Sequence, residues 1–140
     1  MDGFSPCGNT KGRYKIQSCN SVVTQLESEL RDMIEPFNVD NDQFGKILIS
    51  LTEAITNAIR HGNQYDLSKM VDLEFIPCGD KLMFRVSDEG SGFDANNVCD
   101  PTDSINIGRP GGRGVYIIQA FSDKVEFQDN GRTVHMEFDL

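Results

Sequence analysis

The chain has 140 residues, of which 38% are hydrophobic and 25% charged, as is usual for a single globular domain. Its net charge is −9 and no basic patch stands out, which argues against broad binding to nucleic-acid phosphates. No apolar run approaches the ~20 residues of a membrane helix, and Met1 to Phe4 do not begin a signal peptide, so we expect a cytoplasmic protein without membrane contact.

The four cysteines are Cys7, Cys19, Cys78 and Cys99, and no two of them form a CxxC pair. With only two histidines in the chain, the spacing of a zinc site is absent. We therefore expect free thiols in a reducing compartment.

The first third of the chain predicts a leader, a strand and a helix. Residues 1–12 are polar and rich in glycine, which predicts a disordered leader before a single domain over 13–140. Residues 13–17 form a candidate strand. A helix capped by Ser18, Asn20 or Ser21 follows and ends before Pro36. Its apolar stripe is Val22, Val23, Leu26, Leu30, Met33 and Ile34.

A second helix is predicted over 40–60. Asp40, Asn41 and Asp42 supply a cap and favourable charge at its start, and Gly62-Asn63 stops it. Helical spacing places seven apolar residues on one core face: Phe44, Ile47, Leu48, Leu51, Ile55, Ala58 and Ile59.

Two hairpins are predicted in the second half. Strands 70–77 and 82–86 alternate in polarity around a turn, and strands 124–128 and 132–139 flank the turn signal Asp129-Asn130-Gly131.

Between the hairpins, residues 89–113 form a glycine-rich loop of a length typical of a functional lid, and a short helix over 115–121 follows it. This order predicts an α+β fold, a two-layer α/β sandwich with a mixed, mostly antiparallel sheet and helices on one face.

Glu53, Asn57 and His61 are spaced by four on the second helix, so they share one stripe roughly opposite the apolar face. A solvated polar face is one reading of this stripe. The neighbours Ala54 and Ala58 favour another, because small side chains leave room for a ligand. A carboxylate and an amide one turn apart are suited to a general base and an oxygen ligand for Mg²⁺.

Two glycine motifs follow. Asp88-Glu-Gly-Ser-Gly-Phe93 comes directly after a strand, where its glycines permit a sharp bend and Asp88 can accept hydrogen bonds from the amino group of a base. Gly111-Gly-Arg-Gly114 opens the last helix, where free N–H groups and Arg113 favour phosphate. The alternative without a ligand is a plain turn for the first motif and a flexible hinge before the last helix for the second.

Taken together, these segments resemble a known set. Glu53-Ala-Ile-Thr-Asn57-Ala-Ile-Arg-His61-Gly resembles the N box of the GHKL (Bergerat) ATP-binding fold shared by gyrase, Hsp90, histidine kinases and MutL. The motifs at Asp88 and at Gly112-Arg-Gly114 resemble its two glycine boxes. Within that superfamily the chain looks most like the anti-sigma-factor serine/threonine kinases of bacterial partner-switching systems, also because of Asp100-Pro-Thr-Asp103 in the lid.

The resemblance implies roles for the matching positions. Asn57 would bind Mg²⁺, Glu53 would act as general base, and Asp88 would receive the adenine amino group of ATP. Gly90 and Gly92 would lie close to the base and ribose, while Gly112 and Gly114 would place N–H groups on the phosphates. We also expect Gly111 and Arg113 to bind the phosphates, because of their position and, for Arg113, because of its charge. For His61 both a catalytic role and a structural hydrogen bond stay open.

The implied activity is phosphorylation of an anti-anti-sigma factor of the STAS type by a protein that also sequesters a sigma factor and forms a homodimer, with no direct contact to nucleic acid. One alternative is a non-catalytic, nucleotide-dependent binding module of the same fold. A second is the ATP-binding half of a histidine kinase, which the lack of a preceding dimerisation helix disfavours.

Overall fold

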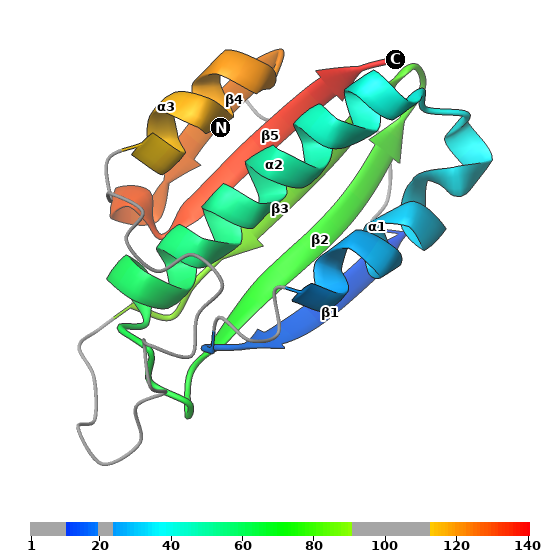
Figure 1. Ribbon diagram of the computed structural model, residues 1–140. Coiled ribbons are helices and arrows are strands. Elements are labelled where there is room, and N and C mark those ends of the chain that lie inside the picture. The colour runs from blue at the N-terminus through cyan, green and yellow to red at the C-terminus, as the bar shows by residue number, and fades with distance from the viewer. Residues whose placement is uncertain (1–10, 20–23, 91–112) are drawn as a thin grey trace.

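The structure is a computed structural model that describes residues 11–19, 24–90 and 113–140. Within these residues three α-helices lie on one face of a five-stranded sheet (Figure 1). The strands are β1 (Gly12–Gln17), β2 (Met70–Cys78), β3 (Lys81–Ser87), β4 (Lys124–Gln128) and β5 (Thr133–Asp139), and the helices are α1 (Leu26–Ile34), α2 (Asn41–Asn57) and α3 (Arg113–Phe121).

The sheet has the strand order β1-β2-β3-β5-β4, and all neighbours in it are antiparallel. The predicted α+β class, with two layers and helices on one face, is confirmed. Both predicted hairpins are present: β2 pairs with β3, and β4 pairs with β5 across a short 3₁₀ turn, Asp129–Gly131.

The predicted first helix is shorter than expected. Its regular α-helical part begins at Leu26, after a 3₁₀ turn at residues 24 and 25, while residues 20–23 lie outside the described ones. It ends at Ile34, and Pro36 lies in the following 3₁₀ turn, Glu35–Phe37. The predicted leader lies almost entirely outside the described residues.

Helix α2 crosses the middle of the sheet (Figure 1) and begins where its sequence predicts. The side chain of Asp40 accepts a hydrogen bond of 2.8 Å from the backbone N–H of Gln43, which satisfies one of the free donors at the helix start. Of the predicted core face only Leu48 is partly exposed, and the other six residues are buried.

Four phenylalanines form a row of ring contacts on the helix-covered face of the sheet. Phe75 stacks on Phe84 with centroids 5.1 Å apart, and Phe37 and Phe138 contact the two ends of this pair edge-on at 5.7 and 5.9 Å. Phe75 and Phe84 are also partners in the β2–β3 register. The hydrophobic pattern and the strand register therefore specify the same alignment.

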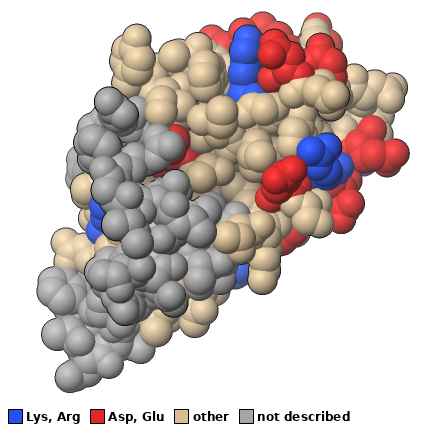
Figure 2. Space-filling view, in the orientation of Figure 1, with Lys and Arg blue, Asp and Glu red and all other residues tan. Residues whose placement is uncertain are grey.

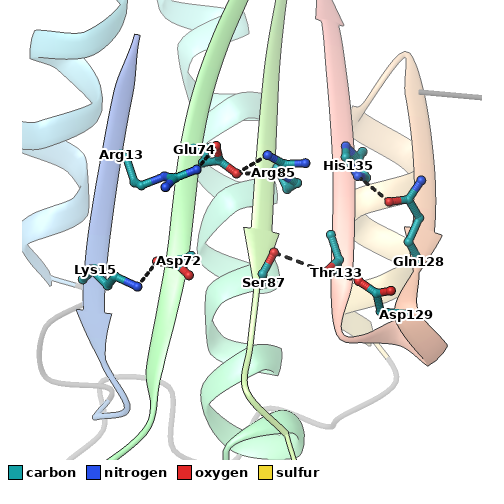
Figure 3. Close-up of polar contacts among 10 residues, drawn as sticks. All are labelled: Arg13, Lys15, Asp72, Glu74, Arg85, Ser87, Gln128, Asp129, Thr133 and His135. Atoms are coloured by element: carbon teal, nitrogen blue, oxygen red, sulfur yellow. Dashed lines mark hydrogen bonds and ion pairs between the residues drawn. The ribbon is translucent and has the colours of Figure 1, made fainter. Parts of the chain in front are cut away.

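The opposite face of the sheet carries polar side chains in rows across the strands (Figure 3). Glu74, which is only 5% exposed, accepts hydrogen bonds from Arg13 Nη2 at 2.7 Å and Arg85 Nε at 2.6 Å. In the neighbouring row Lys15 Nζ lies 3.0 Å from Asp72. Because opposite charges face one another across the strands, these pairs favour the observed register and disfavour a slip by one residue.

The expectation of free thiols is wrong for both cysteines that the structure describes. Cys19 and Cys78 are each disulfide-bonded. The register places them at opposite ends of β2, and at ~3.3 Å per residue they are too far apart to be bonded to each other. The lack of a CxxC pair did not exclude these bonds, because a disulfide can join cysteines at any separation along the chain. Cys7 and Cys99 lie outside the described residues.

The charged groups on the face seen in Figure 2 gather at its upper and right-hand margins, where red acidic side chains outnumber blue basic ones. This distribution agrees with the net charge of −9. Among the described residues, none of the helices is long and apolar enough to cross a membrane.

Truncation of the α2 core face should destabilise the domain strongly. Leu51 is fully buried, so we expect Leu51→Ala to lower the free energy of unfolding by about 2–5 kcal/mol. Ile49 on the same helix is 43% exposed, and Ile49→Ala should cost less than about 1 kcal/mol. Urea denaturation of both variants measures the difference, and equal losses would contradict the assigned orientation of α2.

Candidate functional site

The C-terminal half of α2 carries the first part of the candidate site. Glu53 is 4% exposed, its neighbours Ala54 and Thr56 are buried, and Asn57 is half-buried. A solvated polar face would leave Glu53 in water, so that reading is wrong. Helix α3 packs against α2 and begins beside its C-terminal half (Figure 1). Of this stripe, Glu53 is therefore enclosed and Asn57 partly so, whereas His61 is exposed.

Helix α2 continues into a π-helical turn, Ala58–Gly62. The backbone N–H of Asn63 donates to the carbonyl of Ala58 at 2.8 Å, a bond that spans five residues instead of four. The predicted stop at Gly62-Asn63 is confirmed in position, but neither residue has left-handed backbone.

The left-handed residues come next in the chain. Gln64 and Tyr65 have φ angles of 52° and 61°. A residue with a side chain pays about 1–2 kcal/mol for this conformation, and such strain clusters at functional sites. The end of α2 is therefore held in its shape by contacts elsewhere in the fold.

Asp88 follows β3, and its carboxylate lies against the π turn. A Cβ atom built on Gly62 would overlap the carboxylate carbon of Asp88. A Cβ atom on Gly90 would lie 2.8 Å from Asp88 Oδ1 and 3.0 Å from the carbonyl oxygen of Gly62. A side chain at either glycine would have to displace the Asp88 carboxylate, so the two glycines form a cradle for Asp88.

The two carboxylate oxygens of Asp88 differ in their partners. Oδ1 accepts a hydrogen bond of 2.8 Å from the backbone N–H of Gly90. Oδ2 has no hydrogen-bond donor among the described residues. Burial raises the pKa of Asp88 above its ordinary value, while the Gly90 bond and the charge of Arg132 act in the opposite direction. Asp88 therefore offers a partly desolvated acceptor.

Asn63 lies next to Asp88 in the structure, a position that its sequence context does not predict. Asn63 is completely buried, and its side-chain oxygen accepts a hydrogen bond of 2.8 Å from the backbone N–H of Glu89. In the sequence Gly62-Asn63 reads as an ordinary helix stop. The five-residue hydrogen bond that turns Asn63 inward has no signature in hydrophobic periodicity.

The remaining predicted positions are described less fully. Arg113 and Gly114 are the first residues of α3. Gly92, Gly111 and Gly112, with most of the predicted lid, lie outside the described residues. His61 is exposed, and its side chain has no hydrogen-bond partner in the described part of the chain, so the structural bond, one of the two roles left open for it, is not found there.

The donor set fits Mg²⁺ only in the presence of a further ligand. No group of three or more His, Cys, Asp or Glu residues in the described ranges is arranged to hold a metal ion. Mg²⁺ is commonly held by one or two protein oxygens together with phosphate oxygens and water. The amide oxygen of Asn57 suits such a site, and the cradle at Asp88 suits the amino group of a base.

Burial of the Asp88 carboxylate should lower the stability of the fold. The pKa of Asp88 is higher in the folded state than in the unfolded state, so the protonated carboxyl group favours folding. This contribution to stability is complete below the pKa of the unfolded state and is lost as the pH rises through the pKa of the folded state. We therefore expect Asp88→Asn to raise the melting temperature at pH 7. The gain should shrink below about pH 4, where Asp88 is also protonated in the unfolded chain. A lower melting temperature at pH 7 would contradict the dominance of burial.

Comparison with known proteins identifies the family of the chain. Residues 17–138 match the family model of the histidine kinase-like ATPase domain. The serine-protein kinase RsbW of Listeria monocytogenes is 32% identical over 95 residues, which are 63% of this chain and 60% of that protein. RsbW of Bacillus licheniformis is 30% identical over 102 residues, 68% and 64% of the two chains. The chain thus spans less than two thirds of the length of these two relatives.

A longer alignment relates the chain to the anti-sigma F factor of Clostridium perfringens, with 26% identity over 127 residues, 86% of this chain and 81% of that protein. Among solved structures, the RsbU and RsbW domains of Rv1364c from Mycobacterium tuberculosis superpose with a TM-score of 0.65 at 14% identity, covering 93% of this chain and 33% of that one. This likeness supports the fold alone. The chain belongs to the histidine kinase-like ATPase (GHKL) domain family and is a distant relative of the RsbW serine-protein kinases and of the anti-sigma F factors.

Proposed function

We propose that this chain binds Mg·ATP and transfers its γ-phosphoryl group to a serine or threonine of an anti-anti-sigma protein of the STAS type. In this proposal the same chain also sequesters a sigma factor. The observation that carries the transfer step is the burial of Glu53 one helical turn before Asn57. A binding module needs an amide and glycines, but it has no need of an enclosed carboxylate beside them.

The nucleotide would lie with its base at Asp88 and its phosphates toward α3. Asp88 Oδ2 would accept a hydrogen bond from the exocyclic amino group of adenine, with Gly90 and Gly92 beside the base and ribose. The N-terminus of α3 at Arg113 and Gly114, together with Gly111 and Gly112, would supply N–H groups and the positive end of the helix dipole to the phosphates.

Asn57 would hold the metal through its amide oxygen, with the other positions filled by phosphate oxygens and water. The metal would neutralise charge on the phosphates during transfer. Asn57 and Glu53 are four residues apart, which places them on one side of α2 and about 6 Å apart along its axis.

Glu53 would act as the general base. It would accept the proton of the substrate hydroxyl as the hydroxyl oxygen forms its bond to the γ-phosphorus, while the bond from that phosphorus to the β–γ bridging oxygen breaks and ADP leaves. The remaining acceleration would come from positioning of the two reactants.

Removal of the base should abolish transfer and spare nucleotide binding. We expect Glu53→Gln to lower the rate of partner phosphorylation by about 10²–10⁴-fold while changing ATP affinity little, because the side chain keeps its size. The measurement is phosphoserine on the purified partner by mass spectrometry, beside ATP affinity by calorimetry. Glu29→Gln on the exposed side of α1 is the matched control.

An unchanged rate in Glu53→Gln would remove Glu53 from this role. If the unmodified chain binds ATP and the partner but transfers no phosphate, the chain is a nucleotide-dependent binding module instead.

Loss of the metal ligand should have a different signature. We expect Asn57→Ala to abolish the gain in ATP affinity that Mg²⁺ confers on the unmodified chain, because the amide oxygen is the proposed protein ligand. Titrations with Mg²⁺ and with EDTA measure this gain. The control Asn41→Ala alters an exposed amide at the start of the same helix and should keep it. A full Mg²⁺ effect in Asn57→Ala would show that the metal is held elsewhere.

A further inference from the structure

Asn63 uses its whole side-chain amide to join three segments of the chain. Its Nδ2 donates to Ser18 Oγ at 2.9 Å and to the carbonyl oxygen of Met70 at 3.1 Å, and its Oδ1 accepts from the N–H of Glu89 at 2.8 Å. Ser18 follows β1, Met70 begins β2 and Glu89 follows Asp88. The side chain is completely buried, so loss of any of these bonds leaves a polar group without water.

Glu89 returns a bond to the same place. Its carboxylate accepts a hydrogen bond of 2.6 Å from the backbone N–H of Met70, whose carbonyl oxygen accepts from Asn63. Glu89 is thus held through its backbone by Asn63 and through its side chain by the start of β2. An exposed glutamate in a turn is usually only a solvated charge, but here the residue is fixed at both ends.

These bonds fix the backbone on both sides of the Asp88 carbonyl. The N–H of Asp88 donates to the carbonyl oxygen of Arg132 at 2.9 Å, and the next N–H, that of Glu89, donates to Asn63. Because the backbone is held, the Asp88 side chain can adopt few orientations. Gly62 touches its carboxylate, and Gly90 occupies Oδ1, so Oδ2 is the oxygen left for a ligand.

We propose that Asn63 is a positioning residue that aims the Asp88 carboxylate and thereby sets the preference of the site for an adenine base. This inference rests on the proposed function, in which Asp88 takes the amino group of ATP. A carboxylate accepts a hydrogen bond from that amino group. Guanine presents a carbonyl oxygen at the same position, and a purine without the group presents no donor. Selectivity then depends on where Oδ2 points.

The test compares the affinity of the full chain for ATP with its affinity for purine riboside triphosphate, which lacks only the amino group. We expect the unmodified chain to prefer ATP, and Asn63→Ala to lower that ratio of affinities by about tenfold, because the hydrogen bond to a charged acceptor is misdirected. Gly62→Ala should lower it in a similar way, since its Cβ must displace the carboxylate. If Asn63→Ala does not fold, the Gly62→Ala variant still provides the test. Alanine has a higher helix propensity than glycine, which favours folding of that variant.

Two matched controls distinguish an effect on the orientation of the Asp88 carboxylate from an effect on the stability of the fold. Ser18→Ala removes the Asn63 partner on the β1 side and leaves the Glu89 bond, so it should lower the melting temperature and keep the ratio. Gly45→Ala adds a methyl group to α2 that meets no atom within 4 Å beyond its own turn of the helix, and it should also keep the ratio.

The outcomes distinguish the two proposals. A ratio that falls in Asn63→Ala and Gly62→Ala and holds in both controls supports the positioning role. An unchanged ratio in Asn63→Ala and Gly62→Ala overturns it, as does a ratio that falls in all four variants in step with their melting temperatures. If the unmodified chain binds no ATP, the proposed function fails and this inference fails with it.

Discussion

The hydrogen bond from the N–H of Asn63 to the carbonyl of Ala58 determines how α2 meets the rest of the molecule. It closes a π turn in place of an α turn, which changes the direction in which the following side chains point. Because of this change Gly62 meets the Asp88 carboxylate and Asn63 enters the interior. An α-helical ending would present these residues at other angles, and the cradle around Asp88 would not form.

Helix α2 is buried on two sides for different reasons. One side packs Leu51 and Ile55 into the core above the sheet. The other side carries Glu53, whose carboxyl side chain is almost completely enclosed. A helix that served only the core would expose that second side to water. Burial of a carboxyl side chain is energetically unfavourable, and this is the reason for proposing a catalytic role for Glu53.

The strands, the helices and the layer arrangement could be predicted from the sequence, because periodicity and turn residues act locally. Asp40 and the core stripe of α2 are examples. The disulfides of Cys19 and Cys78 could not be predicted, because the spacing of cysteines in a sequence does not show which of them the fold brings within bonding distance. The partnership of Asn63 with Glu89 also escaped prediction, since it spans 26 residues and depends on one irregular turn. Of the candidate site, Glu53, Asn57 and Asp88 were identified through their resemblance to a family, and their roles stay predictions.

Residues 40–90 form a continuous stretch with α2, the π turn and the β2–β3 hairpin in succession. The contacts that shape the Asp88 cradle, apart from those of Ser18 and Arg132, lie within this stretch. Loop closure over short separations costs less conformational entropy than the pairing of β1 with β2, whose partners Gly12 and Phe75 are 63 residues apart (75 − 12). In folding terms, the proposed base-binding end of the site is built from local contacts, whereas its proposed phosphate-binding end depends on a segment that is synthesised later.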